Sequence, residues 1–390
     1  MPSPLTAKRT HGFTESVIRG MTRLASQHKA INLAQGFPNF AAPDVVKEAA
    51  ARAIRDNVNQ YAVTWGAARL REALAATYAA WYGMEVDPER HVTVTCGATE
   101  AMASVLLATV DPGDEVIILE PFYENYGPDA ILCGAQPVFV PVPFEGALPI
   151  ERIARAFSPR TRAIVLNTPN NPTGRVFSRA ELSEIATLCI ANNVLAITDE
   201  IYERIVFDGE HVPLATLPAM RERTITISGA SKTFSVTGWR VGTIVAPHGI
   251  TDAIRKVHDF LTVGAPAPLQ EGVAAGLEQL GPDFYEALIA GYRARRDVLV
   301  AGLNAAGFTC GVPRGAYYVL ADFSTLSKES DVSFARRLTG EFGVAPVPGS
   351  SFYSQPDLGR KYVRFAFCKT VDLLEEASAR LSNIRERLGV

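Results

Sequence analysis

Short apolar runs alternate with helix-like stretches between about residue 91 and residue 245, and this alternation limits the folds open to the chain. The runs at 116–119 (VIIL) and 163–166 (AIVL) lack the every-second-residue polarity of a half-exposed strand. Such runs are typical of strands that are buried on both faces. Strands that alternate with helices predict a mostly parallel, doubly wound α/β sheet. Such sheets bind ligands beyond the carboxyl ends of their strands, so the residues after each run are the candidates for chemistry.

The pattern changes after residue 281, where a long predicted helix is followed by a few apolar runs and shorter helices. This change predicts a second, smaller α+β domain. We therefore predict a large domain at 46–283 and a C-terminal small domain at 284–390. Residues 1–45 are predicted to form an N-terminal arm that contributes to the small domain.

Composition excludes several classes of protein. The chain has 390 residues, 47% of them hydrophobic, and a formal net charge of −3, which gives no electrostatic reason to expect nucleic acid or an anionic membrane as a partner. No apolar stretch reaches the ~18–20 residues of a membrane span, and the N-terminus lacks the apolar core of a signal peptide. Five scattered cysteines without a CxxC pair and six histidines without HExxH predict reduced thiols, no metal site and a cytoplasmic protein.

The first two strand ends predict a site for a flat, anionic ligand. Small residues after the run at 92–95 open a helix near Ala98 and Thr99, and helix N-termini bind anions such as phosphate. Small residues are also usual in any short strand-to-helix turn, and neither GxGxxG nor GxxxxGK[ST] is present, so no dinucleotide or nucleoside triphosphate is predicted. After the run at 115–119, Phe122 is suited either to the core or to stacking on a flat ring.

The next two strand ends add hydrogen-bonding groups. The turn NTPNNPTG at 167–174 is rigid because of its prolines and asparagines, and Asn171 offers a donor to a ligand oxygen. After the run at 195–198, Asp199 needs a donor or a cation as its partner. A helix cap or a structural ion pair is the alternative interpretation of Asp199. Tyr202 adds a hydroxyl three residues later.

A further strand end supplies a candidate nucleophile. Residues 228–242 read SGASKTFSVTGWRVG, which places Lys232 among small residues with Arg240 eight positions later. A solvent-exposed lysine is the commoner case, but burial and a neighbouring cation lower the pKa of an amine and make it nucleophilic at neutral pH. The anion cradle, aromatic ring, two donors, carboxylate and lysine match the phosphate, ring, phenolic oxygen, ring nitrogen and aldehyde carbon of pyridoxal 5′-phosphate (PLP). We therefore predict PLP as the cofactor.

The same motifs resemble those of the class I aminotransferases of PLP fold type I. Residues 229–242 match the family's PLP-lysine signature, and NPTG at 171–174 and DEIY at 199–202 follow in the expected order. The stretch INLAQGFPNF at 31–40 is similar to the branch of kynurenine, glutamine and methionine aminotransferases. The resemblance covers essentially the whole chain. It implies a homodimer with shared active sites that transfers the amino group of an L-amino acid to a 2-oxo acid by ping-pong chemistry.

The resemblance also implies a role for each matching residue. Lys232 would hold PLP as a Schiff base and move the substrate proton, while Asp199 would pair with the pyridine nitrogen. Tyr202 would assist at the phenolic oxygen. The remaining implied roles are Asn171 and Tyr202 for the phenolic oxygen, Phe122 for ring stacking, Ala98, Thr99, Ser231 and Arg240 for the phosphate, Tyr61 for the phosphate in the partner subunit's site, and Arg364, Gly36 and Asn171 for the substrate carboxylate.

Some positions depart from the family pattern. Gly229 stands where a phosphate-binding serine is common, so one hydroxyl contact is either missing or supplied by Ser228. Ile18 and Gln27 stand where kynurenine-type enzymes tend to have Trp and Glu. These two positions argue against a strictly aromatic or kynurenine substrate.

Two alternatives use the same fold. A PLP-dependent β-lyase acting on cysteine conjugates needs the same residues and stays open as an alternative. A non-catalytic ligand-binding module could dispense with Lys232 or Asp199, but both are present. A hydrolase is not predicted because the chain lacks a GxSxG elbow with ordered acid and histidine partners.

Overall fold

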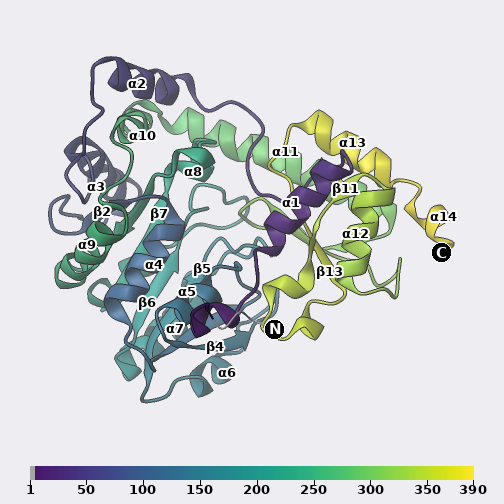
Figure 1. Ribbon diagram of the computed structural model, residues 1–390, viewed down its shortest axis with the longest axis horizontal. Helices are drawn as coiled ribbons and strands as arrows, with labels where there is room; N and C mark the ends of the chain where they lie inside the picture. Colours follow the sequence, from purple (N-terminus) through teal and green to yellow (C-terminus); the bar gives the residue numbers. More distant parts are fainter. Residues whose placement is uncertain (1–4) are drawn as a thin grey trace.

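The computed structural model describes residues 5–390, and residues 1–4 of the predicted N-terminal arm lie outside the described part. A seven-stranded sheet forms the centre of the larger lobe (Figure 1). Its strands are β2 (Val92–Thr95), β3 (Glu115–Glu120), β4 (Gln136–Pro141), β5 (Thr161–Asn167), β6 (Leu195–Asp199), β7 (Thr224–Gly229) and β8 (Gly242–Val245). Their order is β2-β8-β7-β6-β5-β3-β4, and β8 alone runs antiparallel to its neighbours within this sheet. The predicted mostly parallel α/β sheet is therefore confirmed.

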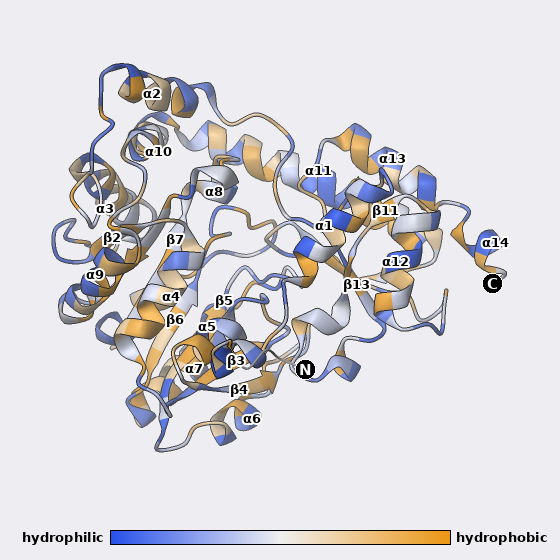
Figure 2. Ribbon diagram, in the orientation of Figure 1, coloured by the Kyte–Doolittle hydropathy of each residue, from blue (hydrophilic) through white to orange (hydrophobic). Residues whose placement is uncertain are grey.

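Successive residues of the central strands enter different apolar cores. On β3, Ile118 belongs to the core beneath α4 (Ala98–Thr109), whereas Ile117 belongs to the core beneath α7 (Arg179–Asn192). Successive side chains of a strand point to opposite faces, so a sheet covered by helices on both faces needs apolar residues at every position. Figure 2 shows this concentration of hydrophobic residues along the strands. The other helices of this lobe are α2 (Asp44–Arg55), α3 (Ala68–Tyr82), α5 (Tyr126–Leu132), α6 (Ile150–Arg155), α8 (Ala230–Thr233), α9 (His248–Thr262) and α10 (Ala267–Gln279).

The smaller lobe has its own sheet and core. Its four antiparallel strands lie in the order β12 (Val347–Pro348), β13 (Tyr362–Ala366), β10 (Tyr318–Asp322), β9 (Thr309–Cys310). The N-terminal strand β1 (Ile31–Asn32) pairs in parallel with β11 (Val344–Ala345). The helices here are α1 (Val17–Gln27), α11 (Pro282–Ala306), α12 (Asp331–Glu341), α13 (Val371–Leu381) and α14 (Ile384–Leu388). This arrangement is the predicted α+β part of the fold.

Helix α11 belongs to both lobes. Near its start, the ring of Tyr285 packs edge-on against Trp81 of α3, with the ring centroids 4.9 Å apart. Further along the same helix, Tyr292 stacks on Tyr317 in the core of the smaller lobe, with the ring centroids 5.7 Å apart. Figure 1 shows α11 running from beside α10 toward α13. The predicted domain boundary at 283/284 falls in the first turn of this helix, and both boundaries stay predictions.

Short 3-10 turns connect these elements. They are η1 (Lys8–His11), η2 (Leu214–Thr216), η3 (Arg221–Arg223), η4 (Thr237–Trp239), η5 (Gly349–Phe352) and η6 (Pro356–Leu358). None of the helices within residues 5–390 is both long and apolar enough to cross a membrane.

Candidate active site

Lys232 lies in α8, a single helical turn that directly follows β7 at the carboxyl edge of the large sheet. Its ammonium nitrogen donates to the carbonyl of Gly36 over 3.3 Å and lies 5.9 Å from the ring centroid of Tyr202. Burial lowers the pKa of Lys232 to about 8, and the charge of Arg240 acts in the same direction. An amine with this pKa is neutral in about a tenth of molecules at pH 7, which is the form that attacks a carbonyl carbon.

Asp199 ends strand β6 with its carboxylate buried beside Lys232. Its Oδ2 accepts a hydrogen bond of 2.6 Å from the hydroxyl of Tyr126, and its Oδ1 accepts one of 3.2 Å from the N–H of Ile201. Burial raises the pKa of Asp199, whereas these two hydrogen bonds and the charge of Lys232 lower it. Each oxygen therefore has a donor within the chain, and these two hydrogen bonds fix the orientation of the carboxylate.

Arg364 lies in the middle of the small sheet on β13 and is fully buried. Its Nη1 donates to Asn171 Oδ1 over 2.8 Å, its Nη2 donates to the carbonyl of Ala34, and its Nε has no partner among the described residues. The guanidinium carbon lies 4.3 Å from the ring centroid of Tyr318. A buried cation whose partners are neutral oxygens is costly unless an anion joins it. A guanidinium binds a carboxylate through two parallel hydrogen bonds, so this site fits a carboxylate.

Three segments form a cradle for an anion near Lys232. Gly97, with φ +84°, precedes the first turn of α4, and a Cβ atom there would collide with the guanidinium of Arg240. Arg240 itself adopts a left-handed backbone with φ 55°. A Cβ atom on Gly242 would in turn collide with the backbone of Gly97 and Ala98. The free N–H groups of α4 and a guanidinium therefore meet at one point, where an anion is stabilised by both the helix dipole and the positive charge.

Two hydroxyls and an amide line the space between Lys232 and Arg364. The hydroxyls of Tyr202 and Tyr318 lie 2.9 Å apart. The amide side chain of Asn171 is held by Arg364, while its backbone N–H donates to Asn167 Oδ1 over 2.7 Å. Asn171 and Tyr202 come from the turns that follow β5 and β6, and Tyr318 comes from the small sheet, so the site forms where the two lobes meet.

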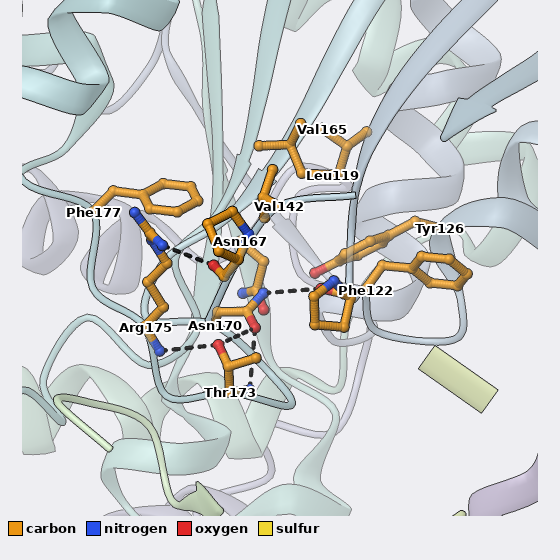
Figure 3. Close-up of a pocket in the computed structure, with 12 residues that line it drawn as sticks. Leu119, Phe122, Tyr126, Val142, Val165, Asn167, Asn170, Thr173, Arg175 and Phe177 are labelled. Carbon is orange, nitrogen blue, oxygen red and sulfur yellow. Dashed lines mark hydrogen bonds between the residues drawn. The ribbon is translucent and has the colours of Figure 1, made fainter. Parts of the chain in front are cut away.

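The ring of Phe122 already has an aromatic partner within the chain. Its ring stacks on Phe139 of β4, with centroids 5.2 Å apart and an interplanar angle of 24°. Figure 3 shows Phe122 with Tyr126 at a narrow pocket of about 10 Å³, which has room for about one water molecule. The next residue, Tyr123, lies in the same loop, and burial together with the nearby charges of Glu124, Tyr318 and Asp199 raises its pKa. The stacking role therefore moves from Phe122 to Tyr123 in our proposal.

Ser228 does not replace the hydroxyl missing at Gly229. The Ser228 hydroxyl donates to Glu203 Oε1 over 2.9 Å and is buried. A Cβ atom at Gly229 would lie 2.8 Å from the carbonyl of Val241. A serine at position 229 would therefore need a shift of the backbone, which gives a physical reason for glycine there. Ser231, which is predicted to bind the phosphate through its hydroxyl, lies buried in the turn of α8.

Tyr61 lies on the surface of the chain. Its side chain is 84% exposed, and Phe260 near the end of α9 is 92% exposed. The two surface segments are linked by a hydrogen bond of 2.9 Å between His258 Nε2 and the carbonyl of Thr64. Two large exposed aromatic residues on linked segments are typical of a protein–protein contact.

Several contact residues were missing from the predicted site, namely Tyr123, Tyr126, Tyr317, Tyr318 and Lys369. Tyr126 follows Phe122 in the same loop, so its nearness to a strand end was the available signal. Tyr318 begins β10 of the small lobe. Its position depends on how the two lobes meet, which no local pattern encodes.

Comparisons with known proteins identify the family. The model of the class I and II aminotransferases matches residues 28–381. The chain is 41% identical to the probable N-succinyldiaminopimelate aminotransferase of Mycobacterium tuberculosis, covering 98% of this chain and 99% of that one. It is 38% identical to the methionine aminotransferase of Escherichia coli (95% and 96% covered) and 37% identical to human kynurenine–oxoglutarate transaminase 1 (98% of both).

A solved structure of N-succinyldiaminopimelate aminotransferase from Mycobacterium tuberculosis superposes with a TM-score of 0.95 at 42% identity, covering 97% of this chain and all of the other. The predicted resemblance, fold type and cofactor are thus confirmed. The chain belongs to the class I and II aminotransferases and is a PLP-dependent enzyme that transfers amino groups.

Proposed function

We propose that this enzyme moves the amino group of an L-α-amino acid to a 2-oxo acid, with Lys232 as the residue that binds PLP covalently. One observation carries the proposal. Lys232 and Arg364 donate to carbonyls only two residues apart, those of Gly36 and Ala34. A partly buried amine of lowered pKa thus lies near a fully buried guanidinium that has no carboxylate partner within residues 5–390, which is the pairing an α-amino acid requires.

The surrounding residues have distinct roles in this proposal. When bound, PLP supplies a ring that accepts the electrons released at the substrate α-carbon. Asp199, oriented by Tyr126, holds the proton of the ring nitrogen. The neutral Lys232 amine would take the proton from the substrate α-carbon and deliver it to the former aldehyde carbon of the cofactor, and in the second half of the ping-pong cycle it would move a proton in the opposite direction. Arg364 and Asn171 bind the substrate carboxylate and so fix the α-carbon within reach of the lysine.

The remaining predicted residues bind and enclose the cofactor. The backbone N–H groups of Ala98 and Thr99, the Ser231 hydroxyl and Arg240 hold the phosphate. Tyr202 and Asn171 bind the phenolic oxygen, and Tyr123 stacks on the ring. We further propose a cytoplasmic homodimer in which Tyr61 reaches the phosphate in the partner subunit's site, and its 84% exposure supports such a role.

Which amino acid the enzyme prefers depends on the residues that contact the substrate side chain. The relatives are named for N-succinyldiaminopimelate, kynurenine and methionine, which share an α-amino acid group and differ beyond it. Ile18 lies buried at the N-terminal helix α1, where an apolar side chain suits an aliphatic substrate. All three named donors therefore belong in the substrate panel.

The test measures turnover of a panel of L-amino acids with 2-oxoglutarate and pyruvate as acceptors. We expect turnover that depends on the oxo acid, and we expect Lys232→Ala to lose steady-state activity by at least about three orders of magnitude. Release of pyruvate and ammonia from a cysteine conjugate without an oxo acid would instead indicate a β-lyase. Wild-type turnover by Lys232→Ala would contradict the proposed role of the lysine.

A further inference from the structure

The loop that lies between Lys232 and Arg364 is held by cations. We call residues 33–39 the Gly36 loop. Arg364 donates to the carbonyl of Ala34, and Lys232 donates to that of Gly36. Arg364 is fully buried and Lys232 is partly buried, and in both cases a peptide carbonyl replaces water or an anion that a cation otherwise requires.

Lys369 is a third buried cation on the same loop. It is 2% exposed, and its ammonium nitrogen donates to the carbonyl of Phe37 over 2.7 Å and to that of Gln35 over 3.4 Å. The same nitrogen lies 3.7 Å from the ring centroid of Phe37. Lys369 therefore brackets Gly36 from both sides through the carbonyls of its two neighbours.

The two ends of the Gly36 loop are fixed in another way. The N–H of Ala366 donates to the carbonyl of Leu33 over 2.8 Å, and the N–H of Thr370 donates to Asn39 Oδ1 over 2.8 Å. These bonds join the loop ends to the last residue of β13 and to the residue before α13. The centre of the loop, by contrast, depends on side-chain donors, and Gly36 has no room for movement toward Tyr318, whose hydroxyl would collide with a Cβ atom at Gly36.

Two of the three cations change partners during the proposed reaction. Arg364 turns its donors to the substrate carboxylate, and Lys232 engages the cofactor. Lys369 has no such second task, because its ammonium nitrogen donates to the loop carbonyls of Phe37 and Gln35. It is the cation whose contacts with the loop persist when the other two are released.

We propose that Lys369 is a positioning residue that holds the Gly36 loop in place for carboxylate binding. This inference rests on the proposed role of Arg364 at the substrate carboxylate. Loss of Lys369 would let the loop centre move, so that the backbone around Gly36 would no longer assist Arg364. The substrate would then bind more weakly, whereas the chemistry at Lys232 would proceed at nearly the normal rate once the substrate is bound.

The experiment compares Lys369→Met, which keeps the apolar length of the side chain, with the wild-type holoenzyme. We expect KM to rise about tenfold for both the amino acid and the oxo acid, with kcat changed less than about threefold. The inhibition constant of a carboxylate that cannot react, such as hexanoate, should rise by the same factor. The PLP dissociation constant and the visible absorbance of the bound cofactor should stay unchanged, because Lys369 does not touch the cradle.

Lys361→Met is the matched control. Lys361 precedes β13 by one residue, its side chain is 56% exposed, and it pairs with Asp322 at 3.1 Å. This variant should show normal KM and kcat. Asn39→Ala is a second way to loosen the Gly36 loop. It removes the hydrogen bond between one end of the loop and Thr370, and it leaves every buried charge in place. We expect a smaller increase of KM in the same direction.

Each outcome decides the inference. Normal KM and inhibition constants in Lys369→Met, or an equal loss of kcat with weaker PLP binding, would overturn it. If Lys369→Met does not fold, normal KM in Asn39→Ala overturns it. Failure of the proposed function looks different, because Arg364→Lys would then bind carboxylates as well as the wild type, whatever Lys369 does.

Discussion

At the scale of single residues, the sequence motifs predicted which residues belong to the site better than they predicted where each side chain points. Lys232, Asp199, Asn171, Tyr202 and Arg364 were predicted from their places after strands and within matching motifs, and the structure brings them together. The stacking aromatic was predicted to be Phe122, whereas we propose its neighbour, Tyr123. Two adjacent aromatic residues in a loop point in different directions, and the choice between them depends on the packing of Phe122 against Phe139. No periodicity within the loop could reveal that contact.

Tyr126 allows a test at this scale. Its hydroxyl donates to Asp199, and a hydrogen bond to the ionised form lowers the pKa of a carboxyl group. Tyr126→Phe should therefore raise the pKa of Asp199. Because Asp199 must be ionised to hold the ring-nitrogen proton, its contribution to activity is lost as the pH falls through this pKa. We expect the acidic limb of the kcat/KM profile to move to higher pH, and kcat/KM at neutral pH to fall about tenfold.

Tyr78→Phe is the matched control for this variant. Tyr78 is buried in the same lobe, and its hydroxyl has no hydrogen-bond partner among the described residues. Removing that hydroxyl should leave the pH profile unchanged. An unchanged acidic limb in Tyr126→Phe would show that the hydroxyl does not tune Asp199.

At the scale of elements, the strands of the large sheet were predictable because burial on both faces leaves an apolar run that differs from any amphipathic helix. Short elements were harder to predict. Strand β1 has two residues and pairs with β11, so its existence depends on a partner more than 300 positions away in the chain. The anion cradle was predicted from small residues near Ala98. The need for glycine at position 97 was not predicted, because it arises from the close approach of Arg240, which lies in a distant part of the chain.

The cradle predicts a specific effect of adding one methyl group. Gly97→Ala places a Cβ atom against the Arg240 guanidinium at a residue with φ +84°. The left-handed backbone costs roughly 1–2 kcal/mol for alanine, and the displaced guanidinium should raise the PLP dissociation constant at least about tenfold. Titration of the cofactor-free protein with PLP measures this constant.

Gly83→Ala separates strain from collision. Gly83 also has a positive φ of 60° at the end of α3, but nothing lies within 4 Å of a Cβ atom there. It should lower the free energy of unfolding by a similar amount and leave PLP binding unchanged. Equal PLP affinities for the two variants would argue against the cradle.

At the scale of the whole molecule, the sequence predicted two lobes and a lasting association of two subunits. The division into lobes was readable because the strand–helix alternation stops. The way they meet was not, because it depends on contacts such as those among Tyr202, Tyr317 and Tyr318, whose ring centroids lie 4.9–5.8 Å apart. The proposed homodimer would form through surfaces that are exposed in the single chain.

Mixed subunits test whether Tyr61 acts across the dimer. Tyr61→Ala and Lys232→Ala should each be nearly inactive alone. Unfolding and refolding them together in equal amounts creates mixed dimers, in which one site has both residues intact. About a quarter of the wild-type activity should return, since half of the dimers are mixed and each has one intact site of two. No recovery, with dimers present by sedimentation, would place Tyr61 outside the partner subunit's site.

The sharing of α11 between the two cores has a mechanical consequence. This helix of 25 residues packs into the large lobe at Tyr285 and into the small lobe at Tyr292, and a continuous helix resists bending. If the small lobe closes over a bound amino acid, we therefore expect it to rotate about α11 rather than to slide past the large lobe. Lys232 belongs to the large lobe and Arg364 to the small lobe. A small rotation would therefore change the distance between these two side chains more than it would change the packing of either core.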